Sequence, residues 1–269
     1  MVRNNNGQGY KMIHPTAIID DSVVIGKDVE IGPYVVIEPM VKIGNNNKIF
    51  ALSHIKGKTD IGSENVIYSF CSIGGDPQDL KYNNEESVLE IGNQNTFREH
   101  CTINRGTKGG GSLTSIGNKS LFMAGVHIAH DCILGDSIIM ANQATLGGHV
   151  IVENKAVIGG ISAIHQFCRV GELSMTGGMS AVENDVPPFV LVIGNRAKIT
   201  GLNLIGLKRA GFLKSNILDL SRIIKKIYSS DSILNEVKKI KSTENILIEN
   251  LKKFMLVESS RGLCRYDKK

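Results

Sequence analysis

The sequence predicts a parallel β-helix followed by an α-helical domain. Three observations predict this fold: an aliphatic residue at every sixth position, an uneven distribution of glycine, and a later change to helical spacing. Residues 1–195 hold 25 of the 29 glycines, and residues 196–269 hold four. We therefore expect the β-helix over residues 1–195 and the helical domain over residues 196–269.

The hexapeptide period sets the geometry of the coils. Isoleucine occupies eleven successive positions at a spacing of six, from Ile13 to Ile73, and the phase resumes at Ile91 and at Ile116. Because six is a multiple of the two-residue strand period, each of these residues can face inward on a short strand. Three hexapeptides then close a triangular coil of 18 residues, and successive coils stack about 4.8 Å apart. Residues 18 apart should therefore lie above one another.

Two segments interrupt the period. They cover about residues 75–90 and 105–115, and both are polar, the second also rich in glycine. A solenoid needs no such segments to fold, so we expect extruded loops that take part in binding.

The final segment differs from the coils in spacing and in charge. Its apolar residues return at helical spacing in four stretches, which should pack on the last coils and cover their open edge. Residues 1–195 hold 14 Lys and Arg against 19 Asp and Glu, whereas residues 196–269 hold 17 against 7. A net charge of +10 there suits nucleic acid, an anionic lipid, a nucleotide phosphate or an acidic protein. The absence of interleaved aromatic residues argues against nucleic acid.

Composition predicts a cytoplasmic protein. No long uncharged apolar run is present, so we expect no integral membrane segment. Residues 1–12 are polar and lack the apolar core of a secretory signal. The five cysteines are scattered without a CxxC pair, which indicates reduced thiols and neither a disulfide framework nor a cysteine zinc site.

Four of the seven histidines form the candidate site: His127, His130, His149 and His165. The coil arithmetic puts His130 beneath Gly148 and Asp131 beneath His149, and it brings His165 near the same edge. A histidine oriented by a carboxylate is a common general base, and a glycine N–H can donate to an oxyanion. Three imidazoles near one point could instead bind zinc.

Several motifs carry a resemblance to a known family. They are PQDLKY, VHIAHDC, GGHV, GGISAIHQFC, DVPPF, NLIGLKRAGF and SSRGLCR. With these the chain resembles the acyl-carrier-protein-dependent UDP-N-acetylglucosamine O-acyltransferases. The resemblance implies left-handed coils and a homotrimer with active sites between subunits. It also implies transfer of an (R)-3-hydroxyacyl group from acyl carrier protein to the 3-hydroxyl of UDP-N-acetylglucosamine, the first step of lipid A synthesis, without metal or other cofactor.

The resemblance also implies roles for individual residues. His130 matches the catalytic base, Asp131 its orienting partner and Gly148 the oxyanion donor. The matching substrate-binding residues are Gln78, Asp79, Lys81, His127, His149, His165, Gln166, Asn203 and Arg209. Gly178 matches the position that limits acyl length, and a glycine there predicts a long donor such as 3-hydroxymyristoyl. Ile205 and Ala210 replace the Glu and second Arg of well-known members, which changes the expected nucleotide contacts.

Three other functions remain as alternatives at this stage. A zinc-dependent hydratase similar to carbonic anhydrase can use the same hexapeptide scaffold, and metal content would identify it. A non-catalytic β-helix would not require the clustered histidines or the loop from Gln78 to Lys81. The N-acyltransferase of the same pathway normally carries an additional N-terminal uridine-binding domain, for which the residues before the first repeat are too few.

Overall fold

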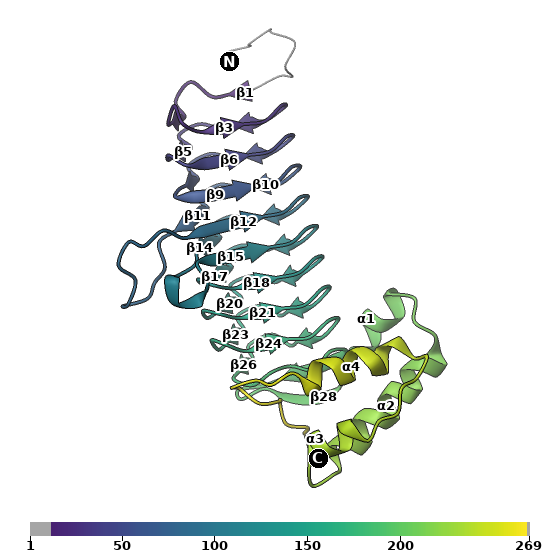
Figure 1. The fold of residues 1–269 in the computed structure, drawn as a ribbon. Helices are drawn as coiled ribbons and strands as arrows, with labels where there is room; N and C mark the ends of the chain where they lie inside the picture. The colour runs from purple at the N-terminus through teal and green to yellow at the C-terminus, as the bar shows by residue number, and fades with distance from the viewer. Residues whose placement is uncertain (1–11, 268–269) are drawn as a thin grey trace.

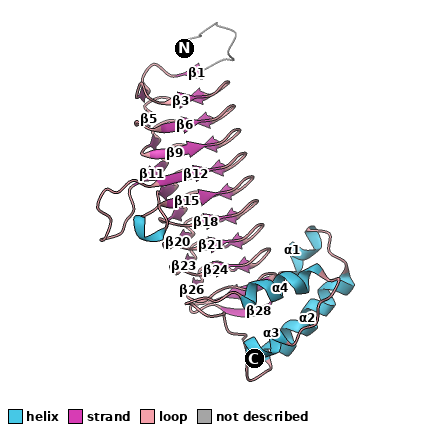
Figure 2. Ribbon diagram, in the orientation of Figure 1, coloured by secondary structure: helices cyan, strands magenta, loops and turns pink. Residues whose placement is uncertain are grey.

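The computed structural model describes residues 12–267, and this part of the chain winds into a β-helix with helices at its C-terminal end (Figure 1). Residues 1–11, on which the prediction about a secretory signal depends, lie outside the described residues. Short strands dominate this part of the chain (Figure 2). Within residues 12–267 they form three sheets, and a coil contributes one strand to each.

We name the sheets A, B and C in the order in which the chain first visits them. Sheet A contains β1 (Met12–Ile13), β4 (Glu30–Ile31), β7 (Lys48–Ile49), β10 (Val66–Ile67), β13 (Thr96–Phe97), β16 (Leu121–Phe122), β19 (Ile139–Met140), β22 (Val157–Ile158), β25 (Met175–Thr176), β27 (Val190–Ile193) and β28 (Lys198–Leu202). Sheet B contains β2 (Ile18–Ile19), β5 (Val36–Ile37), β8 (His54–Ile55), β11 (Ser72–Gly75), β14 (Thr102–Asn104), β17 (His127–Ile128), β20 (Thr145–Leu146), β23 (Ala163–Ile164) and β26 (Ala181–Val182). Sheet C contains β3 (Val24–Ile25), β6 (Val41–Ile43), β9 (Lys58–Ile61), β12 (Val88–Ile91), β15 (Leu113–Ile116), β18 (Ile133–Leu134), β21 (Ile151–Val152) and β24 (Arg169–Val170).

The register follows the 18-residue coil. Ile13 pairs with Ile31 and Ile128 pairs with Leu146, in parallel strands. The hexapeptide residues point inward, and Ile37 is only 1% exposed. Aromatic rings enter the core where the period places phenylalanine, since Phe97 and Phe122 stack with centroids 4.9 Å apart. The core is therefore a column of repeated layers.

Turns at the three edges of the prism stack as regularly as the strands. The turns that join sheet B to sheet C form a column that we call the B–C edge, and the A–B edge is defined in the same way. Many turn residues adopt left-handed conformations, among them Asp131 with φ 60° and His149 with φ 62°. Such a conformation is uncommon for residues other than glycine. Successive coils therefore repeat a turn that requires a left-handed residue.

Both interruptions of the period leave the prism at the B–C edge. The first loop joins β11 to β12 over residues 76–87, and the second joins β14 to β15 over residues 105–112. The second loop contains the short 3₁₀ helix η1 (Lys108–Gly110). Sheet pairing continues across the loops, as the pairing of Ile73 with Ile103 illustrates.

The coils end in a pair of antiparallel strands, which the sequence did not predict. Strand β28 pairs antiparallel with β27, so residues 198–202 form a strand beyond the expected boundary at residue 195. Up to residue 267, the last that is described, four helices follow: α1 (Leu204–Arg209), α2 (Lys214–Tyr228), α3 (Ile233–Lys238) and α4 (Ile246–Leu256). They correspond to the four predicted helical stretches. The division into two domains stays a prediction.

No helix in the described part of the chain combines the length and the hydropathy that crossing a bilayer requires.

Candidate functional site

Asp131 is a buried, hydrogen-bonded side chain of the B–C edge. Its carboxylate is fully buried. Thr107 donates to it twice, from the backbone N–H to Oδ1 at 2.7 Å and from Oγ1 to Oδ2 at 2.6 Å. The Asp131 N–H donates in turn to Thr114 Oγ1 at 2.8 Å. The second loop therefore fixes this carboxylate in place.

The contact between Asp131 and His130 determines which ring nitrogen carries the proton. His130 Nδ1 lies 2.8 Å from Asp131 Oδ2. Because an ionised carboxylate only accepts hydrogen bonds, we assign the proton to Nδ1. The Nε2 lone pair is then available, and within residues 12–267 it has no hydrogen-bond partner. This is the arrangement of an oriented general base.

Gly148 lies against the imidazole of His130, one coil further along. A Cβ atom at this position would lie 2.6 Å from His130 Cε1, so only glycine allows the backbone to approach so closely. In the described residues no acceptor meets the Gly148 N–H. The free N–H beside the base can therefore donate to a developing oxyanion.

His149 completes this cluster. Its Nε2 lies 3.8 Å from Asp131 Oδ2, and its ring stacks on Phe167 with centroids 4.4 Å apart. Burial lowers the pKa of His149, an effect that Asp131 opposes and His130 strengthens. The ligand atoms of His130, Asp131 and His149 lie within 4.8 Å of one another, close enough to hold a metal ion.

His127 lies on sheet B beside the cluster. Thr102 Oγ1 and His127 Nδ1 are 2.8 Å apart, one coil from each other. Burial lowers the pKa of His127, and His130 adds to this effect. Desolvation therefore favours the neutral form of this histidine.

His165 and Gln166 extend the edge by one coil, in the turn between β23 and β24. Both side chains are exposed. Arg261, in the segment after α4, donates to His165 Nδ1 at 2.7 Å. The C-terminal segment therefore reaches the same edge as the histidines.

The first loop carries the other predicted residues of this region. Gln78 and Lys81 are exposed, and Asp79 is half-buried. A pocket of about 450 Å³ lies between the two loops, and its lining includes Asp79, Lys81 and Thr107. Since Thr107 also holds Asp131, this pocket adjoins the support of the candidate base.

The remaining predicted residues lie away from the cluster. Asn203 caps α1, accepting from the Gly206 N–H at 3.0 Å and donating to Leu173 O at 2.9 Å. Arg209 is exposed near the end of α1. Gly178 lies on the A–B edge, so within one chain it does not approach His130. Ile205, also on α1, is 65% exposed.

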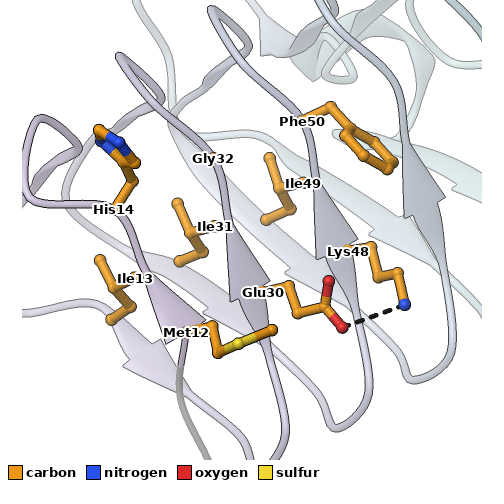
Figure 3. Close-up of a pocket in the computed structure, with 9 residues that line it drawn as sticks. All are labelled: Met12, Ile13, His14, Glu30, Ile31, Gly32, Lys48, Ile49 and Phe50. Atoms are coloured by element: carbon orange, nitrogen blue, oxygen red, sulfur yellow. Dashed lines mark ion pairs between the residues drawn. The ribbon is translucent and has the colours of Figure 1, made fainter. Parts of the chain in front are cut away.

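A separate pocket of about 200 Å³ lies at the N-terminal end of the prism (Figure 3). Gly32 leaves a gap between the side chains of His14 and Phe50, and Lys48 pairs with Glu30 at 3.0 Å beside it. It lies on the coils of β1, β4 and β7, and none of its lining residues belongs to the histidine cluster.

Comparisons with known proteins decide the family. A family model described as UDP-N-acetylglucosamine O-acyltransferase, domain 2, matches residues 185–264. The acyl-[acyl-carrier-protein]–UDP-N-acetylglucosamine O-acyltransferase of Janthinobacterium sp. (strain Marseille) is 49% identical over 84% of this chain and 87% of its own length. That of Campylobacter concisus is 43% identical over 94% of this chain and 97% of its own. The chain belongs to the UDP-N-acetylglucosamine O-acyltransferase family.

Solved structures agree with this assignment. The UDP-N-acetylglucosamine acyltransferase from Campylobacter jejuni has a TM-score of 0.89 and 40% identity, covering 95% of this chain and all of that one. The likeness to such UDP-N-acetylglucosamine O-acyltransferases confirms the predicted fold class, a left-handed parallel β-helix followed by helices.

Some residues of the site were missed by the sequence analysis. Phe167 lies 18 residues after His149, so the coil arithmetic could have found its stacking contact. Thr107 and Arg261 lie outside the repeat, where no arithmetic indicates their partners.

Proposed function

We propose that this chain transfers an (R)-3-hydroxyacyl group from acyl carrier protein to the 3-hydroxyl of UDP-N-acetylglucosamine, the first step of lipid A biosynthesis. The family relationship supports the substrates, since the relatives are named for both. The observation that carries the chemistry is the hydrogen bond from His130 Nδ1 to the buried Asp131, which leaves Nε2 as a base.

The reaction follows from these atoms. Nε2 of His130 takes the proton of the sugar hydroxyl while the hydroxyl oxygen bonds to the thioester carbon. The carbonyl oxygen becomes an oxyanion, which the Gly148 N–H stabilises. The intermediate then expels the carrier's thiolate, and His130 returns the proton to that sulfur. Asp131 remains ionised and stabilises the imidazolium that forms between the two transfers.

The other predicted residues would bind the substrates. We assign Gln78, Asp79 and Lys81 to the sugar nucleotide or acyl group, because their loop borders the pocket beside Thr107. His127 and His149 would position the sugar.

His165 and Gln166 would contact substrate at the next coil, where both are exposed. Arg209 is exposed and free to meet a nucleotide phosphate. Asn203 would act indirectly, since both atoms of its amide already serve α1 and its surroundings.

A homotrimer would complete the site. The separation of Gly178 from His130 on two edges supports this, because only a second copy could bring a Gly178 to the B–C edge. Ile161 and Met179, on the same edge as Gly178, are 61% and 75% exposed in the single chain, as apolar residues of a subunit interface would be. Sedimentation at the mass of a single chain would reject the trimer.

We also propose a cytoplasmic location. All five cysteines are free and buried, a pattern typical of a reducing compartment. Cell fractionation with a tagged chain tests this.

A zinc-dependent hydratase is the second candidate, favoured by the three ligand atoms within 4.8 Å. It is the weaker one, because the cluster combines two imidazoles with a carboxylate that already accepts three hydrogen bonds. Stoichiometric zinc in the purified protein, with activity lost to a chelator, would support the hydratase and reject the acyltransferase.

Mass spectrometry of the products tests the function directly. The protein is incubated with UDP-N-acetylglucosamine and a panel of acyl carrier thioesters, and the expected product carries one 3-hydroxyacyl ester. In the same assay His130→Ala should form no such product. His54→Ala is its matched control, because His54 pairs with Glu38 at 2.7 Å elsewhere on the prism. No acylated sugar nucleotide with any donor would reject the proposal.

A further inference from the structure

Arg105, at the start of the second loop, is a nearly buried cation whose hydrogen bonds reach the end of β11 and the first loop. Its side chain is 10% exposed. One guanidinium nitrogen donates to Gly74 O at 2.6 Å. The other donates to Asp76 Oδ1 at 2.6 Å and to the Tyr82 hydroxyl at 3.1 Å. The guanidinium therefore contacts the first loop at its beginning, Asp76, and again six residues further along, at Tyr82.

The surrounding backbone is shaped around this guanidinium. Gly57, with φ 63°, faces it so closely that any Cβ there would overlap the Arg105 side chain. The Arg105 N–H donates to Gly75 O at 3.0 Å, which ties the two loops together at their bases. Lys56 donates to the second carboxylate oxygen of Asp76 at 2.9 Å. The hydrogen bond from Lys56 is the main cause that lowers the pKa of Asp76, burial opposes it and Arg105 adds to the lowering, so Asp76 stays ionised as a partner.

The segment between these two contact points carries three of the proposed substrate-binding residues. Gln78, Asp79 and Lys81 lie between Asp76 and Tyr82, so Arg105 restrains both sides of the proposed substrate-binding stretch. Two residues after Arg105, Thr107 donates twice to Asp131. One short segment thus connects the first loop with the carboxylate that orients the base.

We propose that Arg105 is a positioning residue that holds the first loop at the right place for the sugar nucleotide relative to the His130–Asp131 pair. This inference rests on the proposed function. In this proposal Arg105 acts through the first loop and not through a contact with substrate. Its planar fork reaches Gly74, Asp76 and Tyr82 together, which the single ammonium of a lysine cannot do. Since Thr107 and Asp131 keep their own contacts, loss of the fork should loosen substrate binding and leave the base oriented.

The test is Arg105→Lys, with Arg222→Lys as the matched control because Arg222 is exposed on α2 and, among residues 12–267, its side chain pairs only with Asp219. We expect KM for UDP-N-acetylglucosamine to rise about tenfold, the size of one lost charge-assisted hydrogen bond, with kcat within about twofold of wild type. The pH profile of kcat should stay unchanged. A purely structural role would lower the melting temperature or the active fraction without changing KM.

A second variant keeps the test valid if Arg105→Lys does not fold. Tyr82→Phe removes the hydroxyl that accepts from Arg105 at 3.1 Å and donates to Glu85 O at a longer 3.5 Å, and we expect KM to rise about threefold. Where Arg105→Lys folds, adding Tyr82→Phe should raise KM little further, because both changes remove the contact between Arg105 and the Tyr82 hydroxyl. Additive effects, or a loss confined to kcat, would overturn the proposal.

Calorimetric binding of UDP-N-acetylglucosamine separates this inference from the proposed function. Wild type that binds the sugar nucleotide but transfers no acyl group would reject the proposed function only. Transfer by wild type together with an unchanged dissociation constant in Arg105→Lys would reject the role of Arg105 only.

Discussion

Replacing Gly148 with alanine tests the proposed geometry of the catalytic centre with a single methyl group. The new Cβ would lie 2.6 Å from Cε1 and 2.8 Å from Nε2 of His130. The φ angle of Gly148 is not in the left-handed region, so alanine imposes no backbone strain of its own. The methyl group therefore acts chiefly on the imidazole beneath it.

The size of the effect follows from the contacts of His130. The ring must move by about 0.8 Å to reach an ordinary van der Waals distance of 3.4 Å from the methyl group. Asp131 cannot follow, because Thr107 holds both of its oxygens. The bond between His130 Nδ1 and Asp131 Oδ2 must then lengthen or bend. A misplacement of this order costs about 10²-fold in rate, or about 2.7 kcal/mol in activation free energy.

The assay is kcat for acyl transfer to UDP-N-acetylglucosamine, with thermal denaturation to confirm that the variant folds. Gly201→Ala is the control, since a Cβ at Gly201 meets no atom within 4 Å. We expect Gly201→Ala to match wild type and Gly148→Ala to lose about 10²-fold in kcat with a similar melting temperature. A folded Gly148→Ala within about threefold of wild-type kcat would refute the proposed contact between backbone and base.

Three further predictions concern other residues of the site. His130→Ala should lower kcat by at least about 10²-fold and leave the fold intact, whereas His54→Ala should be neutral; turnover above about a tenth of wild type would exclude His130 as the base. Gly178→Met should shift preference from fourteen-carbon to ten-carbon 3-hydroxyacyl carriers. A Cβ at this position makes an ordinary contact with the Gly160 backbone at 3.4 Å, so the Met side chain can be accommodated and would exclude the longer chain; an unchanged ratio in competition rejects the length assignment. Burial lowers the pKa of His149 in the folded state, so as the pH falls this histidine is protonated in the unfolded chain before it is protonated in the folded one. The free energy of unfolding should therefore decrease as the pH drops below about 6.5. His149→Gln should weaken this dependence in thermal denaturation, and equal slopes would contradict it.

The coils could be predicted from sequence because their physics is periodic. Each inward residue recurs at six, so the register of Ile13 with Ile31 follows without any knowledge of the loops. The last strands could not be predicted in this way, since Lys198–Leu202 belongs to an antiparallel pair that depends on the end of the prism. A terminal edge is satisfied by whichever segment can reach it, and sequence spacing alone does not identify that segment.

The candidate site could likewise be predicted where it lies on the repeat, and could not be predicted where it lies in the loops. Stacking at 18 residues predicted that His130 meets Gly148 and that Asp131 lies near His149, and the structure has both contacts. The partners of Asp131 were not predicted, because Thr107 lies in a loop without a period. Sequence also could not reveal that the Asn203 amide is occupied as a helix cap, since capping depends on where α1 begins.

The position of both loops explains how one scaffold can hold a rigid base beside an adaptable binding surface. His130 and Asp131 belong to a turn whose backbone is fixed by coils on either side, with Asp131 in a left-handed conformation that isolated chains rarely adopt. The loops emerge from the same edge, where insertions leave the pairing of Ile73 with Ile103 undisturbed. Their residues therefore can change without cost to the sheets, while Thr107 and Arg105 tie them to the turn. Selectivity for substrate should accordingly vary with the loops, and the protonation chemistry should stay with the coils.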